Sequence, residues 1–245
     1  IAAANGIIDF AINGAAADKG TLTLDASNKA IDVQQKIGGN SALKKVNFNT
    51  GTHGITLANT NVKVGAITFK GGKDLELDLD TDTTVALGDG IAALTLKPAV
   101  AAVDLGKVTA ARDGVGAIKV DTSTKALTFA EVGTRQRSLG SIEITNLAND
   151  VQFKQATYVK GGINLTDENA AGTIILGDGG LAEARFNNDF TTSKDGVGKV
   201  KFENARGGKI FFKGNIGAND KKFEEILVSG QHTDVRFIDN GAYAT

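Results

Sequence analysis

Apolar and polar residues alternate along almost the whole chain, as in Ile8-Asp-Phe10-Ala-Ile12 and Leu75-Glu-Leu77-Asp-Leu79. A period of two places the apolar side chains on one face of a β-strand. The segments recur about every 8–12 residues between turn-forming residues, a spacing typical of all-β proteins. Helical periodicity is nearly absent, and the best helical candidate is the short patch Ala99–Ala102. The predicted strands include 8–12, 22–24, 31–33, 46–48, 55–57, 62–64, 67–69, 75–79, 85–87, 94–96, 103–105 and 235–237.

The same series of predicted strands and glycines occurs three times in the sequence, starting at Gly20, Gly116 and Gly198. The copies cover approximately residues 20–115, 116–197 and 198–245 of what we take to be one unit, 1–245. Apolar positions and glycines recur, whereas the polar positions between them do not. The repeated residues are therefore those that pack in the interior, and no set of reactive side chains is repeated. The equivalent apolar sets, which all keep the same two offsets between copies, are Leu43/Leu139/Phe223, Val46/Ile142/Ile226 and Ile55/Val151/Val235.

A sandwich or a closed barrel also has short strands at this spacing, but its strands differ because each occupies a different place. The long repeat instead predicts a right-handed parallel β-helix, that is, a β-solenoid with degenerate internal repeats. At roughly 20 residues per coil, we expect on the order of ten to twelve coils and a rod roughly 50 Å long. Val46, Ile142 and Ile226 should occupy equivalent interior positions, and the phenylalanines should fill the wider core layers.

Composition narrows the function classes. The 245 residues carry 27 basic and 28 acidic side chains, which gives no electrostatic footprint for nucleic acid or an anionic membrane. The absence of Cys excludes disulfides and thiolate metal sites. No apolar run approaches the roughly 20 residues that a membrane-spanning helix needs, so none is predicted. The chain starts at Ile1 without a signal sequence and stops at Thr245 in mid-unit, so we expect a piece of a longer solenoid.

Several short motifs suggest chemistry, but each fits a structural role better. Asp78-Leu-Asp80-Thr-Asp82 resembles the opening of a calcium loop, yet Thr83 and Asp89 stand where that loop needs Gly and Glu. The only histidines, His53 and His232, are isolated. We therefore predict no catalytic, cofactor-binding or metal-binding residue. Other candidates interpreted as turns, loops or chance are Gly88–Gly90, Gly177–Gly180, the glycosylation-like Asn164-Leu-Thr166, and the basic pairs Lys44/Lys45, Arg135/Arg137 and Lys221/Lys222, which we place in turns just before strands.

The segment Ile37-Gly-Gly-Asn-Ser-Ala-Leu-Lys-Lys-Val-Asn-Phe48, preceded by Gly20-Thr-Leu-Thr-Leu, resembles the passenger regions of the rickettsial outer-membrane autotransporters, outer membrane proteins A and B. The resemblance implies a secreted passenger on the bacterial cell surface, a virulence-associated surface antigen, with a membrane barrel elsewhere in the full protein. It implies an adhesin or surface-layer role. The implied partners are a host-cell surface protein or neighbouring copies, with no nucleic acid and no direct membrane insertion.

Two other functions remain open at this stage. A polysaccharide lyase or hydrolase can be built on a β-helix, because the fold alone does not decide function. Such an enzyme would need acidic and basic side chains from successive coils to converge in a groove. A phage or fibre structural segment is the other alternative. Scarce Tyr and absent Trp weaken a sugar site based on aromatic platforms.

Overall fold

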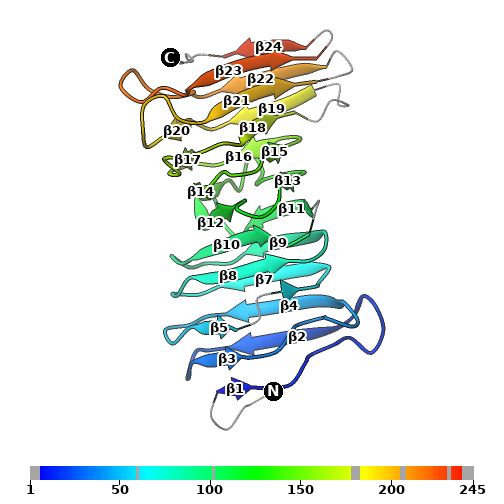
Figure 1. Ribbon diagram of the computed structural model, residues 1–245. Coiled ribbons are helices and arrows are strands. Elements are labelled where there is room, and N and C mark those ends of the chain that lie inside the picture. The colour runs from blue at the N-terminus through cyan, green and yellow to red at the C-terminus, as the bar shows by residue number, and fades with distance from the viewer. Residues whose placement is uncertain are drawn as a thin grey trace.

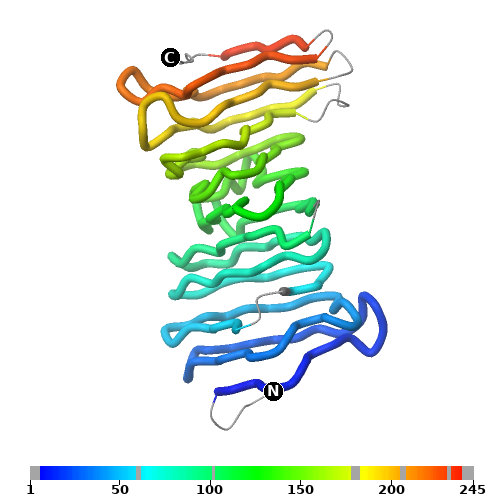
Figure 2. The backbone as a smooth tube through the Cα atoms, viewed as in Figure 1, coloured from blue at the N-terminus to red at the C-terminus, as the bar shows by residue number. Residues whose placement is uncertain are grey.

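The computed structural model describes residues 6–58, 61–100, 103–177, 183–204, 208–230 and 233–238. Over these ranges the protein is all-β, without a helix, and its parallel strands stack as a β-solenoid of about 9 turns. Coils follow one another along a single axis, with the N-terminal and C-terminal coils at opposite ends (Figures 1 and 2). The predicted fold class is therefore confirmed. Ala99 and Val100 are irregular, and residues 101 and 102 lie outside the described part.

All strand pairs within the sheets are parallel, and each strand pairs with its counterpart one coil away. A three-stranded sheet holds β1 (Ile7–Ile8), β3 (Ile31–Val33) and β5 (Ile55–Leu57). A seven-stranded sheet holds β6 (Asn61–Val62), β8 (Leu75–Leu79), β10 (Ala93–Pro98), β12 (Val115–Asp121), β14 (Leu139–Asn146), β17 (Ile163–Leu165) and β20 (Phe190–Thr192). A ten-stranded sheet holds β2 (Lys19–Asp25), β4 (Leu43–Asn49), β7 (Ala66–Lys70), β9 (Thr83–Leu87), β11 (Val103–Ala110), β13 (Leu127–Phe129), β15 (Val151–Phe153), β18 (Thr173–Leu176), β21 (Lys199–Glu203) and β23 (Glu225–Ser229). A four-stranded sheet holds β16 (Thr157–Tyr158), β19 (Glu183–Asn187), β22 (Lys209–Lys213) and β24 (Asp234–Phe237).

The coils differ in length, and this corrects the expected coil count. Ile67 pairs with Val85 in a short coil, whereas Ile174 pairs with Val200 in a longer one. Longer corners and loops use more chain per coil than the average of roughly 20 residues expected for such a solenoid. The protein therefore has about 9 turns rather than ten to twelve, and a length of about 40 Å rather than 50 Å.

Strand β11 turns a corner, which makes the ten-stranded sheet two faces of the solenoid. Residues 103–105 of β11 pair with β13, whereas residues 108–110 pair with β9. Leu105 is in register with both neighbours, since it also pairs with Thr83 of β9. The register shifts between Leu105 and Val108, and the backbone turns there around Gly106. The sheet thus leaves one face and enters the next within a single strand.

We define three faces from this pairing. The first face runs from β2 to the second half of β11, and single bridges at Val132 carry it into the four-stranded sheet. The second face is formed by strands β8 to β20 of the seven-stranded sheet. The third face runs from the first half of β11 through β13, β15, β18 and β21 to β23.

The interior is one continuous column of aliphatic side chains and phenylalanine rings. Phe129 and Phe153 stack with their ring centroids 4.9 Å apart and their planes 9° apart. Of the six phenylalanines predicted to be internal, Phe48, Phe69, Phe129, Phe153 and Phe202 are buried. Phe237 is 42% exposed, so that prediction is wrong for the last described coil, where no further described coil covers it.

The repeat has a different relation to the coils from the one we expected. Val46 and Ile142 are buried and Ile226 is partly buried, yet they lie on the first, second and third faces respectively. The prediction that parallel strands point these residues into one core is confirmed, with Ile226 only partly covered. The predicted equivalence of their positions is wrong, because they lie on different faces. The number of residues between one copy and the next does not correspond to a whole number of coils. Each copy therefore begins on the next face of the solenoid. From Leu22 to Ile118 the chain makes four coils plus one face.

What the copies share is backbone conformation at their turns. Gly38, Gly133 and Gly217 have φ of 75°, 62° and 73°, and each follows a buried aliphatic residue. A side chain is strained at such φ values, so the recurring glycine has a direct backbone reason. The glycines that open the three copies, Gly20, Gly116 and Gly198, all have φ 82°.

Candidate functional site

In the calcium-like acidic motif, Asp82 contributes to a corner of the solenoid. Strand β8 ends at Leu79, and Asp82 lies just beyond it, where its Oδ1 accepts the backbone N–H of Asp104 at 2.8 Å. Asp89 pairs with Arg112 at 2.7 Å. Within the described ranges, no three His, Asp or Glu side chains come together in an arrangement that could hold a metal ion.

Aspartates at the corners link successive coils instead. Each accepts a backbone N–H from the next coil, where the ladder of strand hydrogen bonds is interrupted. Such a link matters because an unpaired buried N–H costs about 1–3 kcal/mol. The acceptors are Asp74, Asp82, Asp113, Asp150, Asp189 and Asp195.

Asp113 and Asp80 should respond to pH in opposite ways. Hydrogen bonds from the backbone amide and then the side chain of Ser138, followed by one from Lys160, lower the pKa of Asp113 below 3.8. Burial, with a further contribution from the charge of Asp78, raises the pKa of Asp80 above 3.8. The stability from Asp113 is therefore present above pH 3.8 and is lost as the pH falls through its folded pKa. The stability from Asp80 is present below pH 3.8 and is lost as the pH rises through its folded pKa.

Two neutral substitutions test this. We expect Asp80→Asn to raise the melting temperature near pH 7 and Asp113→Asn to lower it there. Both effects should shrink near pH 3, where the carboxyl groups gain protons. Thermal unfolding followed by circular dichroism at the two pH values measures this. A destabilised Asp80→Asn protein at neutral pH would show that its charge is favourably solvated.

The remaining motifs have structural places. Arg135/Arg137 and Lys221/Lys222 lie in turns before β14 and β23, as predicted, whereas Lys44 and Lys45 lie inside β4, which corrects that prediction. The ring of His53 is exposed and its Nδ1 lies 3.3 Å from the Ala26 carbonyl oxygen. Asn164 accepts a hydrogen bond from Thr191 at 3.0 Å, and Gly88–Gly90 follow β9 as a turn. Residues 178–180 and His232 fall outside the described part.

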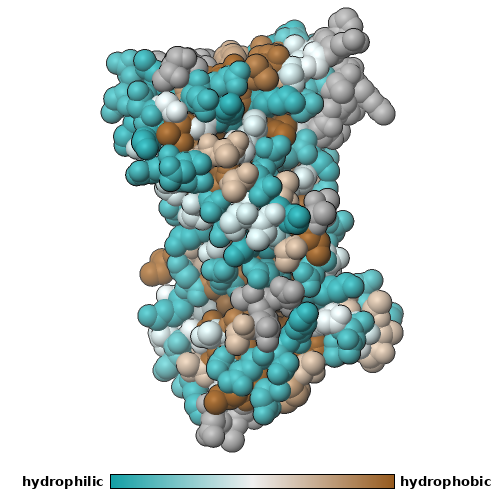
Figure 3. Space-filling model, in the orientation of Figure 1, coloured by the Kyte–Doolittle hydropathy of each residue, from teal (hydrophilic) through white to brown (hydrophobic). Residues whose placement is uncertain are grey.

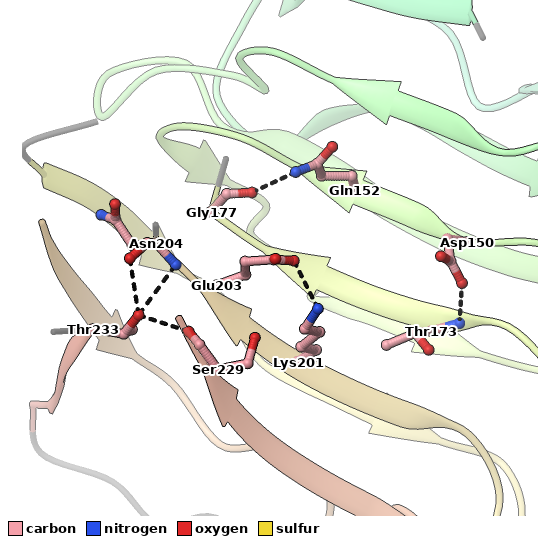
Figure 4. Close-up of polar contacts among 9 residues, drawn as sticks. All are labelled: Asp150, Gln152, Thr173, Gly177, Lys201, Glu203, Asn204, Ser229 and Thr233. Carbon is pink, nitrogen blue, oxygen red and sulfur yellow. Dashed lines mark hydrogen bonds and ion pairs between the residues drawn. The ribbon is translucent and has the colours of Figure 1, made fainter. Parts of the chain in front are cut away.

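A polar cluster on the third face, near the C-terminal end, also serves the fold (Figure 4). Thr233 accepts the Asn204 N–H at 3.2 Å. Its single hydroxyl proton is shared between the main-chain oxygens of Ser229, at 2.6 Å, and Asn204, at 3.0 Å. Lys201 and Glu203 form an ion pair at 2.9 Å within β21. These contacts hold one corner and one strand of the solenoid.

A groove of about 910 Å³ lies on the first face. It begins at the 134–138 turn and crosses β16, β19 and β22, so it runs across successive coils rather than along one strand. Three coil spacings, or about 14 Å, separate Arg135 from Lys213. Ile238 lines the groove one coil further on. The molecular surface is largely hydrophilic in the view of Figure 3, where apolar residues form scattered spots. We call this hollow the coil-crossing groove.

Four cations line the coil-crossing groove: Arg135, Lys160, Arg185 and Lys213. Lys160 pairs with Asp113 at 3.1 Å, and Arg185 pairs with Glu183. Neither Arg135 nor Lys213 has a carboxylate within ion-pair distance among the described residues. The groove therefore contains two positive charges that the described chain leaves without an opposite partner.

A row of outward-facing side chains on the first face restricts the position of one of these cations, Arg185. Arg185, Phe211 and Arg236 are in register on β19, β22 and β24. The guanidinium carbon of Arg185 lies 4.6 Å from the Phe211 ring centroid, and that of Arg236 lies 5.8 Å from it. Cation–π attraction of this kind is worth about 0.5–1 kcal/mol at exposed sites and restricts the Arg185 side chain.

The groove lining also contains a buried amide. Asn188 is only 5% exposed, and neither its Nδ2 nor its Oδ1 has a hydrogen-bond partner among the described residues. The next residue, Asp189, uses its Oδ1 to accept the N–H of Asn215 at 2.7 Å. A buried amide without a partner is costly. Both polar atoms of Asn188 are covered by protein, so a ligand in the groove does not reach them.

A second hollow of about 470 Å³ lies on the same face, on the other side of the 134–137 turn. Its lining is mainly small residues of β9 and β11, such as Ala86 and Thr109, with Lys107 and Arg137 at its border. Lys107 pairs with Glu131 at 3.0 Å. This hollow offers less charge than the coil-crossing groove.

Sequence reasoning missed this site. In the sequence, Arg135 stands out only as part of a basic turn, and Lys160, Arg185 and Lys213 belong to no motif. Each of the four cations follows the previous one by about one coil. That spacing is a usable signal only when the coil length is known.

In comparisons with known proteins, the chain matches no protein-family model, no curated protein and no solved structure. Among the described residues, there is also no helix long and apolar enough to span a membrane.

Proposed function

We propose that this chain is a non-enzymatic passenger segment displayed on a bacterial cell surface, where it acts as an adhesin or surface scaffold. The sequence resemblance to rickettsial autotransporter passengers supports display. The β-solenoid supports a scaffold role, because its stacked coils expose a long surface on a rigid interior column.

The observation that carries the proposal is the coil-crossing groove. Its cations come from four successive coils and lie along the solenoid axis, an arrangement that suits an extended ligand. The aspartates at the coil corners, including Asp113 and Asp189, accept backbone N–H groups. Carboxylates engaged in this way hold coils together, which favours binding over acid–base catalysis at this surface.

Cell binding tests the proposal. The fluorescently labelled chain should bind cultured mammalian cells saturably in flow cytometry, and excess unlabelled chain should compete. Alternatively, a scaffold role should appear as reversible self-association in analytical ultracentrifugation. A chain showing neither behaviour would contradict the proposal.

The enzyme alternative gives a different result. Incubation with acidic and neutral polysaccharides should leave the polymer length unchanged in size-exclusion chromatography. Progressive shortening of a polymer, accompanied by new reducing ends or unsaturated uronates, would instead identify a lyase or hydrolase and overturn the non-enzymatic assignment.

A further inference from the structure

We infer that the coil-crossing groove binds an acidic polysaccharide, whose carboxylate or sulfate groups pair with Arg135, Lys160, Arg185 and Lys213. This inference rests on the proposed function, because it names the ligand through which the surface would adhere. Arg135 and Lys213 mark the two ends of the cationic row and have no described carboxylate partner. They supply the charge that a polyanion neutralises.

The two central cations are also accessible. Lys160 and its partner Asp113 are 65% and 47% exposed, and Arg185 and Glu183 are 50% and 43% exposed. Exposed ion pairs are weak, so a multivalent anion can displace or share them. Arginine also binds carboxylate and sulfate groups with two parallel hydrogen bonds, and the Phe211 ring holds Arg185 ready for such a contact.

The backbone around the groove argues against an added peptide strand. Strand β19 pairs with β16 and β22, and β22 pairs with β19 and β24. Their main-chain groups are therefore used within the sheet, whereas strand addition needs a free sheet edge. A ligand that crosses these coils contacts only side chains of the protein. The ligand must therefore be recognised through its own side groups.

The amide of Asn188 does not select the ligand, because both of its polar atoms are covered by protein. Recognition rests on the row of cations, which matches anionic groups repeated along one polymer chain. Charge recognition of this type also needs no Trp or Tyr platform, so the scarcity of these residues does not oppose it.

The experiment measures binding of defined polymers by isothermal titration calorimetry. Heparin oligosaccharide carries sulfate and uronate, dextran sulfate carries sulfate, polygalacturonate carries uronate, and dextran is neutral. We expect heparin to bind and dextran not to bind, with affinity that falls as salt rises. Comparison of dextran sulfate with polygalacturonate shows which anionic group is recognised. Poly-glutamate serves as the acidic polypeptide.

Matched variants locate the site. Arg135→Glu with Lys213→Glu should weaken heparin binding about tenfold or more. The control, Lys44→Glu with Lys221→Glu, changes the net charge equally outside the groove and should bind normally. Asn188→Leu should leave heparin binding unchanged, because both polar atoms of this amide are covered by protein and do not meet the ligand.

Three results would overturn the inference. One is equal loss of binding in both double variants, which would indicate general charge attraction. Another is binding of poly-glutamate as tight as that of heparin, which would indicate an acidic protein partner. The third is saturable cell binding without affinity for any acidic polysaccharide, which would remove this ligand and leave the adhesin proposal intact. If the chain also failed to bind cells, both the polysaccharide inference and the adhesin proposal would be contradicted.

Discussion

Replacing Phe153 by Ala is expected to lower the free energy of unfolding by about 3–5 kcal/mol. Phe153 is fully buried, stacks on Phe129 at 4.9 Å and meets the edge of Phe190 at 6.1 Å between ring centroids. Removal of its ring leaves a cavity in the interior column, and the cavity is lined by the coils on both sides. Chemical denaturation followed by circular dichroism measures the loss.

The damage should stay local, because each coil of a solenoid contacts its neighbours. Hydrogen exchange in Phe153→Ala should quicken in β13, β15 and β18 and remain slow in β4 and β7. Phe237→Ala is the matched control, since that ring is 42% exposed on the last described coil, and it should cost roughly half as much or less. Uniformly faster exchange along the chain would contradict a column of locally coupled coils.

Gly38→Ala should destabilise the protein by at least about 2 kcal/mol. Gly38 has φ 75°, and a Cβ there would lie 2.1 Å from the Lys63 carbonyl oxygen in the next coil. The backbone has little room to adjust, because the Lys63 N–H donates to the Ile37 carbonyl at 3.0 Å. The melting temperature and denaturant midpoint measure the effect.

Gly106→Ala is the control for this substitution. Gly106 lies at the corner of β11 without a positive φ, and a Cβ there would sit 3.5 Å from the Thr84 Cγ2, an ordinary contact. We expect little change or a stabilisation of up to about 1 kcal/mol, since Ala restricts the unfolded chain. Equal loss in both variants would show that the left-handed backbone at Gly38 is not the cause.

The fold could be predicted from sequence because its two strongest signals are local. Alternation of apolar and polar residues marks the strands, and the recurring segment that includes Gly38 and Gly133 marks turns with left-handed backbone. Coil number and phase could not be predicted in the same way. The equivalence of Val46 and Ile142 failed because corner lengths vary, and a repeat shifted by part of a coil places the same motif on another face.

The coil-crossing groove could not be predicted because it is a property of stacking. Arg135 and Lys160 acquire a common surface only when the chain between them completes one coil. The missing partners of Asn188 depend on tertiary surroundings that no local pattern contains. Corner aspartates such as Asp113 were equally hidden, because their acceptor role depends on which backbone N–H the next coil presents.

Lysine footprinting with heparin tests the central claim most directly, since it reports the stacking of coils and the ligand surface together. Lys160 and Lys213 lie two coils apart on the first face, whereas Lys44 and Lys221 lie outside the groove. Acetylation followed by mass spectrometry should show Lys160 and Lys213 protected together by heparin, with Lys44 and Lys221 unchanged. Protection of Lys44 and Lys221 with continued labelling of Lys160 and Lys213 would contradict the account.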